Sequence, residues 1–216
     1  IGSAININNG STLALTSAGS GNYRYDFRTN VNFDAGGGGA IRLLRKEVNW
    51  VSWGGNTITT NGGLQNRIYS DAADSYGINL SGLAFNTAVG SQTTTGDLRV
   101  EVPLVNGGTI TKSGAGTVVL ANGDGNAAFS ATPYTTTTIN AGSFIVGDGG
   151  TSGRLGSGTV TVASGANLVF NRSNALSVSN TITGAGNVQQ LGTGSSTLSG
   201  TNTYTGNTYL SGGVLA

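Results

Sequence analysis

The residues of this chain that could do chemistry come from a short list of types. The sequence contains no His and no Cys, so a Ser-His-Asp triad, Cys-His catalysis and the usual zinc sites cannot be built from it. Carboxylate, Tyr, Lys and Arg chemistry remains possible, but the sequence does not group such residues convincingly. We therefore expect no catalytic residues, no metal site and no cofactor, and we expect the protein not to be an enzyme.

The candidate that comes nearest to catalytic chemistry is the cluster of Arg67, Asp71 and Asp74. Two carboxylates at a defined separation, helped by a basic group, are what a glycoside-cleaving enzyme needs. A solvated loop that carries the same charges is the alternative we favour. A polysaccharide-binding or polysaccharide-cleaving protein thus stays open as a minor hypothesis.

Two further groups of residues could bind a ligand without reacting with it. Trp50 and Trp53 could form a platform on which a sugar stacks, yet residues three apart on a strand face opposite sides, so we expect at least one in the core. The stretch "RYDFR" would place Arg24 and Arg28 on one strand face with Asp26 between them. Such a face is more typical of exposed ion pairing than of a binding stripe.

The elements that must position these residues are expected to be strands. Of 216 residues, 38 are Gly and 9% are charged, and the glycines separate alternating β-branched runs such as "GTVTVASGANLVF". Only 40–47, "AIRLLRKE", is a candidate helix. The net charge of +1 predicts no nucleic acid partner and no anionic membrane surface, and no apolar run approaches the ~20 residues of a membrane-spanning helix.

Internal repeats organise the chain. A start element occurs at 3–15, "SAININNGSTLAL", and at 158–170, where Gly165 aligns with Gly10. The first half of an end element occurs at 111–120 and 189–198, which aligns Gly114 with Gly192. Its second half occurs at 134–146 and 204–216, which aligns Gly142 with Gly212. Repeats of this kind predict a β-solenoid whose coils stack at ~4.8 Å. Coils of roughly twenty residues would give about ten coils and a rod about 48 Å long.

The repeat itself resembles a known family. "GGTITKSGAGTVVL" at 107–120 and "LSGTNTYTGNTYLSGGVLA" at 198–216 are similar to the autotransporter-associated β-strand repeat, and 1–15 is also similar. The resemblance implies a right-handed parallel β-helix in the passenger of a surface-exposed or secreted bacterial protein. It implies a stalk or scaffold and carries no catalytic residues, so function does not transfer with it.

The resemblance is weak over 16–106, which divides the single solenoid of 1–216 into two sections. Residues 16–106 form an irregular section that holds 14 of the 19 charged residues and both tryptophans, and 107–216 form the regular section. Irregular segments on a rigid scaffold usually carry recognition, so an adhesin that binds a glycan or a protein on a host or cell surface would use 16–106. The alternative is a wider part of the same solenoid with aromatic side chains in its core.

The two ends suggest self-association. A solenoid terminus exposes strand edges and an open core unless it is capped, and neither end of this sequence supplies a cap. We expect copies to stack head to tail into a filament, because such a contact does not close. The alternative is a segment cut from a longer passenger, whose neighbouring coils supply the same contacts. The residues expected at this contact are Ile1, Ile5, Ile7, Tyr204, Tyr209, Val214, Leu215 and Ala216.

Overall fold

The computed structural model describes residues 4–15, 23–27, 29–43, 48–53, 56–70, 78–80, 83–87, 97–105, 108–121 and 135–216. Within these ranges all regular secondary structure is β-strand. The strands are β1 (Ala4–Ile7), β2 (Thr12–Leu15), β3 (Tyr23–Phe27), β4 (Asn30–Phe33), β5 (Ala40–Leu43), β6 (Val48–Trp53), β7 (Asn56–Thr60), β8 (Asn66–Ser70), β9 (Ile78–Leu80), β10 (Leu83–Thr87), β11 (Leu98–Val100), β12 (Leu104–Val105), β13 (Thr109–Ser113), β14 (Thr117–Leu120), β15 (Thr136–Ile139), β16 (Ser143–Val146), β17 (Val160–Val162), β18 (Asn167–Phe170), β19 (Leu176–Val178), β20 (Ile182–Thr183), β21 (Asn187–Gln190), β22 (Ser195–Leu198), β23 (Thr208–Leu210) and β24 (Val214–Leu215).

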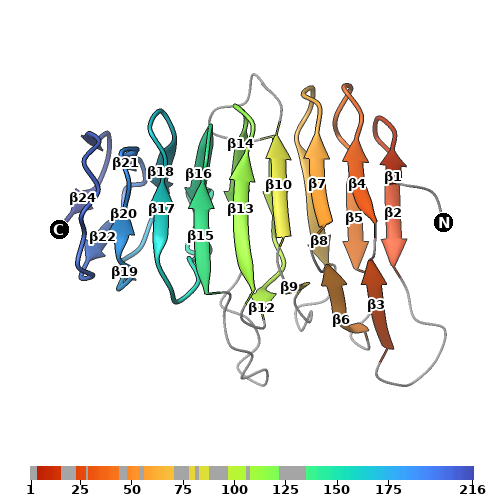
Figure 1. The fold of residues 1–216 in the computed structure, drawn as a ribbon, viewed down its shortest axis with the longest axis horizontal. Coiled ribbons are helices and arrows are strands. Elements are labelled where there is room, and N and C mark those ends of the chain that lie inside the picture. Colours follow the sequence, from red (N-terminus) through yellow and green to blue (C-terminus); the bar gives the residue numbers. More distant parts are fainter. Residues whose placement is uncertain are drawn as a thin grey trace.

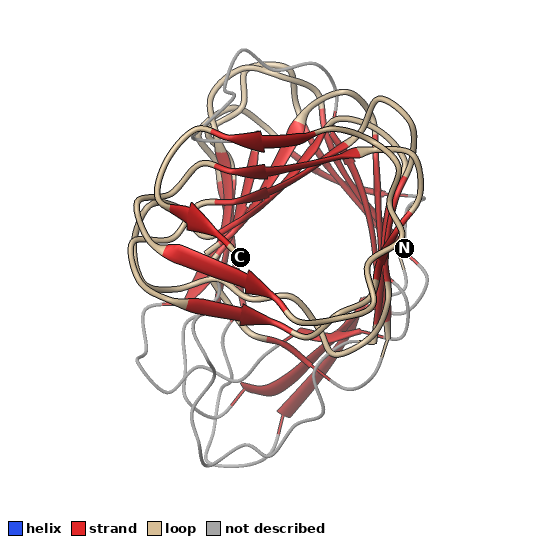
Figure 2. Ribbon diagram, turned by 90° about the vertical axis from the view of Figure 1, so that its left-hand side faces the viewer, coloured by secondary structure: helices blue, strands red, loops and turns tan. Residues whose placement is uncertain are grey.

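The strands form parallel sheets that run along the long axis of the molecule (Figure 1). Sheet 1 has the order β1-β4-β7-β10-β13-β15-β17-β20, and sheet 2 has the order β2-β5-β8-β11-β14-β16-β18-β21-β23. A third side is formed by sheet 3a, β12-β9-β6-β3, in the first half and by sheet 3b, β19-β22-β24, at the other end. Viewed along the axis, successive strands overlie one another on the sides of a coil (Figure 2). The predicted parallel β-helix is thus confirmed.

The candidate helix at 40–47 does not form in its described part. Ala40–Leu43 is strand β5, and the reason is burial. Ile41 has no exposed surface and pairs in register with Ile68 of the next rung, so the segment extends sheet 2 and points Ile41 into the core. Residues 44–47 lie outside the described ranges.

The coils are longer than expected in the first part of the chain. Asn6 pairs with Asn32, 26 residues later, and Asn30 with Thr57, 27 residues later. The predicted length of about twenty holds between β11 and β14, where Thr117 contacts Asp97 at a spacing of 20, and again near the end, where Thr161 contacts Thr183 at a spacing of 22 and Asn167 contacts Asn187 at a spacing of 20. The extra residues lie in the connections, because the strands of sheets 1 and 2 pair in continuous register from rung to rung.

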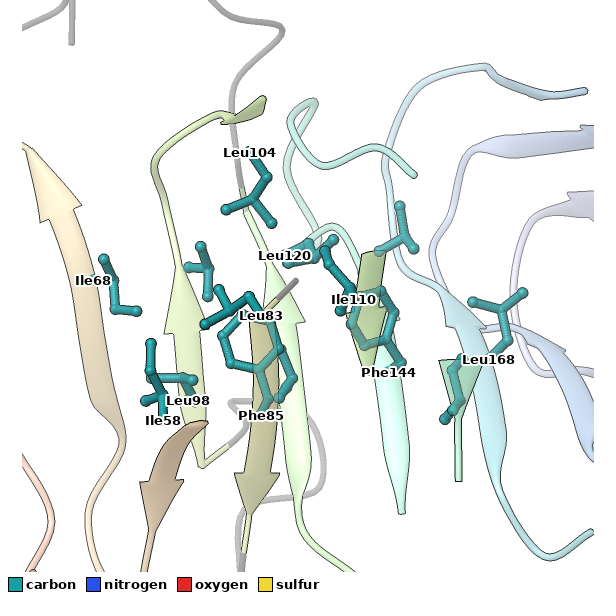
Figure 3. Packing of buried hydrophobic residues seen from close by; sticks show 14 of the residues in the cluster. Ile58, Ile68, Leu83, Phe85, Leu98, Leu104, Ile110, Leu120, Phe144 and Leu168 are labelled. Atoms are coloured by element: carbon teal, nitrogen blue, oxygen red, sulfur yellow. The ribbon is translucent and has the colours of Figure 1, made fainter. Parts of the chain in front are cut away.

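The core consists of side chains stacked from rung to rung at equivalent strand positions. In sheet 1 one such column contains Val31, Ile58, Phe85, Lys112, Ile139 and Val162. In sheet 2 a column contains Ile41, Ile68, Val100, Leu120, Val146, Phe170 and Gln190. All of these side chains are fully or almost fully buried. Figure 3 shows Ile58, Phe85 and Ile68 among the inward-pointing residues. Each column is apolar except for Lys112 and Gln190.

The structure places the two copies of the start element on the same corner of the coil. Both are a strand of sheet 1, a turn and a strand of sheet 2, and the aligned Gly10 and Gly165 both have positive φ, 69° and 79°. The end elements differ. The copy at 111–120 and 134–146 joins sheet 1 to sheet 2, whereas the copy at 189–198 and 204–216 joins sheet 2 to sheet 3b. The repeated unit is therefore a strand–turn–strand that serves at either corner, not a fixed part of a coil.

Candidate functional site

Arg67 belongs to an ion-pair row on the outer side of sheet 2. Its Nε lies 2.7 Å from Glu101 Oε1 and its Nη2 lies 2.9 Å from Oε2, and the guanidinium lies 4.5 Å from the centre of the Tyr69 ring. The hydrogen bond to Glu101 raises the pKa of Arg67. The row continues through Arg99, whose Nη2 lies 2.6 Å from Asp148 Oδ2. Exposed pairs of this kind contribute about 0–1 kcal/mol.

This arrangement does not support Arg67 as part of a catalytic cluster. Its partner Glu101 lies 34 residues away in sequence and reaches it because the next rung stacks on β8. Asp71 and Asp74, the carboxylates expected beside it, lie outside the described residues. The row has the geometry of a surface salt-bridge network, in which each carboxylate is already engaged by a guanidinium.

The aromatic candidates are placed by their backbone. Trp50 and Trp53 belong to β6 and Arg24 to β3, and the two strands pair in sheet 3a with Arg24 opposite Trp50. Their side chains, and Arg28 as a whole, lie outside what the structure describes. The sugar-stacking platform and the arginine stripe therefore stay predictions.

Two buried charged side chains, Lys112 and Asp97, lie inside the coil, where the sequence indicated no site. Lys112 has no exposed surface, and its Nζ donates to the carbonyls of Ser113, Gly114 and Ala141 at 2.9, 2.7 and 2.9 Å. Burial lowers the pKa of Lys112 to about 8. Asp97 is 2% exposed and its Oδ2 accepts from the Thr117 amide at 2.6 Å, and burial raises its pKa.

The contacts of Lys112 hold together a corner of the coil. A lysine with a lowered pKa can act as a base or nucleophile, but the Lys112 ammonium is directed at three backbone carbonyls of the turns that follow β13 and β15. Gln190 does the same in sheet 2, where its Nε2 donates to the carbonyls of Gly192 and Gly194. In both cases a polar side chain in an apolar column satisfies a tight turn. For both Lys112 and Gln190, the signal in the sequence is a single polar residue at a strand position that points inward.

The expected self-association residues divide between the two ends of the described solenoid. Ile5 and Ile7 of β1 pack on the core at one end, and Ile1 lies outside the described residues. At the other end Tyr204 and Leu215 also pack against the core, whereas Tyr209 is 46% and Val214 is 53% exposed. Ala216 hydrogen-bonds with Ser196 and Leu198 of the preceding rung. The structure thus gathers the C-terminal residues on one terminal rung.

That terminal rung presents strand edges. Within the described residues, β23 pairs only with β21 and β24 pairs only with β22. Ser211 N donates to Gln190 and Asn207 O accepts from Val188, both toward β21. Because backbone groups of alternate residues in a parallel strand bond to opposite neighbours, those of Thr208 and Leu210 point to the other side. The exposed apolar residues Tyr209, Leu210 and Val214 accompany this edge.

The described residues contain neither a candidate metal site nor a candidate membrane-spanning helix. There, no three His, Cys, Asp or Glu residues gather closely enough to hold a metal ion. The same residues include no helix that is long and apolar enough to cross a membrane.

Comparisons with known proteins return no match: none among protein-family models, none among curated proteins and none among solved structures. The resemblance to the autotransporter-associated repeat therefore stays a prediction from the sequence.

Proposed function

We propose that this chain is a structural, non-enzymatic scaffold that is displayed on a bacterial cell surface or secreted. Copies of its solenoid stack end to end, rung on rung, into a filament. The location rests on the resemblance of 107–216 to passenger repeats. The scaffold role rests on the architecture: parallel pairing continues from β2 to β23 without a break in sheet 2, over nine strands.

The single observation that carries the proposal is the exposed edge of β23. A parallel strand edge with unpaired backbone groups is a template for another strand, and two residues of this strand are exposed here, Leu210 at 64% and Tyr209 at 46%. The opposite end of the rod offers β1 and β2, which begin sheets 1 and 2. A second copy that docks β2 on β23 would continue sheet 2 in the same direction, and such a heterologous contact propagates.

The proposal is tested by a charge placed on the edge and a matched charge placed elsewhere. Leu210→Lys puts an ammonium on β23, where lysine blocks edge pairing. Leu64→Lys makes the same change at a residue of equal exposure, 64%, in the connection between β7 and β8, far from β23. Electron microscopy and sedimentation velocity at high protein concentration should show filaments of the wild type and of Leu64→Lys, and short single rods of Leu210→Lys.

Wild-type protein that stays a uniform population of monomers at high concentration would reject the filament. The edge of β23 would then be covered by further coils of the same chain, as in an adhesin stalk. Filaments that form equally well with Leu210→Lys would also reject this edge as the contact.

A further inference from the structure

The outer face of sheet 1 carries a regular array of threonines in the second half of the rod. Each of four successive rungs has a Thr-x-Thr sequence there, and the middle residue of each is buried: Ile110, Thr137, Val160 and Ile182. The two threonines beside a buried strand residue point to the outside. We call these outward residues the threonine face; they are Thr109, Thr111, Thr136, Thr138, Thr159, Thr161, Thr181 and Thr183.

The pairing register stacks these threonines in two parallel columns. Strands β13, β15, β17 and β20 pair in this order, and Figure 1 shows them side by side along the rod. At each step a threonine of one rung lies opposite a threonine of the next. The first column consists of Thr111, Thr138, Thr161 and Thr183, and the second consists of Thr109, Thr136, Thr159 and Thr181.

The two columns form a two-dimensional lattice of hydroxyl and methyl groups. Rungs lie ~4.8 Å apart, and outward residues two apart on one strand lie about 6.6 Å apart. Threonine is stiff at χ1 because its Cβ is branched, so the positions of these groups vary little. Thr161 Oγ1 lies 3.3 Å from Thr183 Oγ1. Because a hydroxyl has one donor and two acceptor sites, both still have sites for water.

The threonine face is uncharged and differs from the rest of sheet 1. No Asp, Glu, Lys or Arg occurs among its residues. In the first half of the sheet, Thr57 of β7 lies between asparagine and alanine: its amide accepts contact from Asn30 Oδ1 at 2.9 Å, and it pairs with Ala84. Threonine is favoured in strands generally. That preference does not explain why, among the described strands of this sheet, stacked Thr-x-Thr pairs follow one another only from β13 onward.

We propose that the threonine face binds the surface of an ice crystal. Its two repeats are close to repeats of the oxygen lattice on the prism planes of ice. Threonine hydroxyls can hold water at lattice positions by hydrogen bonds, and the methyl groups restrict the orientations of the first water layer. A face without charge suits this ligand, because strongly hydrated charges arrange water differently. This inference depends neither on the scaffold role nor on the filament.

Ice binding is tested on the whole chain by two measurements. The first is thermal hysteresis, the gap between the melting and freezing temperatures of a single ice crystal in the protein solution. An adsorbed protein forces the growing ice surface to curve between molecules, which lowers the freezing temperature alone. The second is the fraction of protein that enters a slowly growing ice front. Wild type should show hysteresis and enter the ice.

Two matched variants locate the binding face. Thr161→Lys places an ammonium in the middle of the lattice and should lose most of the hysteresis and of the incorporation into ice. Thr57→Lys makes the same change at a half-buried threonine of the same outward column, on an isolated rung, and should behave as wild type does. Thr161→Ser keeps the hydroxyl and removes one methyl, so it should lose less than Thr161→Lys. Thermal unfolding verifies that each variant is folded.

The result is separable from that of the filament test. Leu210→Lys changes the strand edge and leaves the threonine face intact, so it should retain ice binding. The proposal is overturned if wild type shows no hysteresis and enters ice no more than an unrelated protein of the same size. It is also overturned if Thr161→Lys and Thr57→Lys lose equal activity. Adsorption to crystalline cellulose without adsorption to ice would assign the face to a polysaccharide surface and would overturn it as well.

Discussion

Lys112 is a charged residue in an otherwise apolar column of the core. Its neighbours on the rungs below and above are Phe85 and Ile139, and all three are fully buried. Removing an ammonium from water costs several kcal/mol. Three carbonyl acceptors offset part of that cost, and each would lose a partner if the donor were removed. The residue is therefore a compromise between a satisfied turn and a buried charge.

This compromise predicts a pH-dependent stability. Burial lowers the pKa of Lys112 to about 8, against 10.5 for the unfolded chain. Between these two values the unfolded state binds more protons than the folded state, so the free energy of unfolding should rise with pH through this window. Lys112→Gln, which keeps a donor for the turn as Gln190 does, should lack this rise. Urea unfolding of both proteins at about pH 7 and about pH 10 measures the difference.

Two features of the experiment make the result specific to this side chain. Every other side chain is common to wild type and Lys112→Gln, so contributions that do not involve Lys112 cancel in the difference. Asp97 acts with the opposite sign, because its raised pKa makes the folded state bind more protons, so that its contribution falls as pH rises above 3.8. Parallel pH profiles of wild type and Lys112→Gln above about pH 8 would contradict the assignment.

At the scale of the element, the turns between sheets depend on glycine for two different reasons. Gly114 and Gly165 both have positive φ, 76° and 79°. A Cβ on Gly114 would lie 2.0 Å from the carbonyl oxygen of Thr87 on the preceding rung, whereas a Cβ on Gly165 would meet nothing within 4 Å. The first turn is closed by backbone contact between rungs, and the second is open to solvent.

Alanine at these two positions should therefore have different effects. Gly165→Ala should cost about 1–2 kcal/mol, the strain of a left-handed backbone with a side chain. Gly114→Ala should cost about 3 kcal/mol or more, because the rungs must also separate. Chemical denaturation of the two variants gives both values. Equal destabilisation would show that the contact with Thr87 relaxes freely.

The sequence predicted these elements better than it predicted their roles. The alternation of "GTVTVASGANLVF" located β17 and β18, because an inward position every second residue is a local property of a strand. The corner served by each end element was not predictable, since strand–turn–strand sequences look alike whichever two sheets they join. Coil length was equally hidden, because it depends on connections such as the one between β16 and β17.

The candidate sites were harder to predict because they join residues of different rungs. Arg67 was expected beside Asp71 and Asp74, yet its carboxylate partner is Glu101, from the next rung. The threonine face joins separate rungs in the same way, because a single Thr-x-Thr is ordinary in a strand and only the pairing register stacks these pairs in columns. The lone polar positions of Lys112 and Asp97 could have been noticed once the inward register was known.

For the whole molecule, stability is expected to follow position along the rod. In a solenoid each rung contacts only its neighbours, so an inner rung is held from both sides and a terminal rung from one. The inward column of sheet 2 is fully apolar at β16 and β18 but reaches a polar residue, Gln190, at β21. Amide exchange should therefore be slowest in β16 and β18 and fastest in β23 and β24.

If copies stack head to tail as proposed, this gradient should depend on concentration. The backbone amides of Thr208 and Leu210 point away from β21, toward the side where a second copy would pair. Their exchange should slow as protein concentration rises, while that of Ser211, which already donates to Gln190, should change less. In Leu210→Lys the exchange of Thr208 should stay fast at every concentration. Hydrogen exchange followed by NMR at low and high concentration resolves these amides. Thr208 protection that is already high and constant with dilution would mean that the edge is covered within one molecule, and the rod would then be a stalk unit instead of a polymerising one.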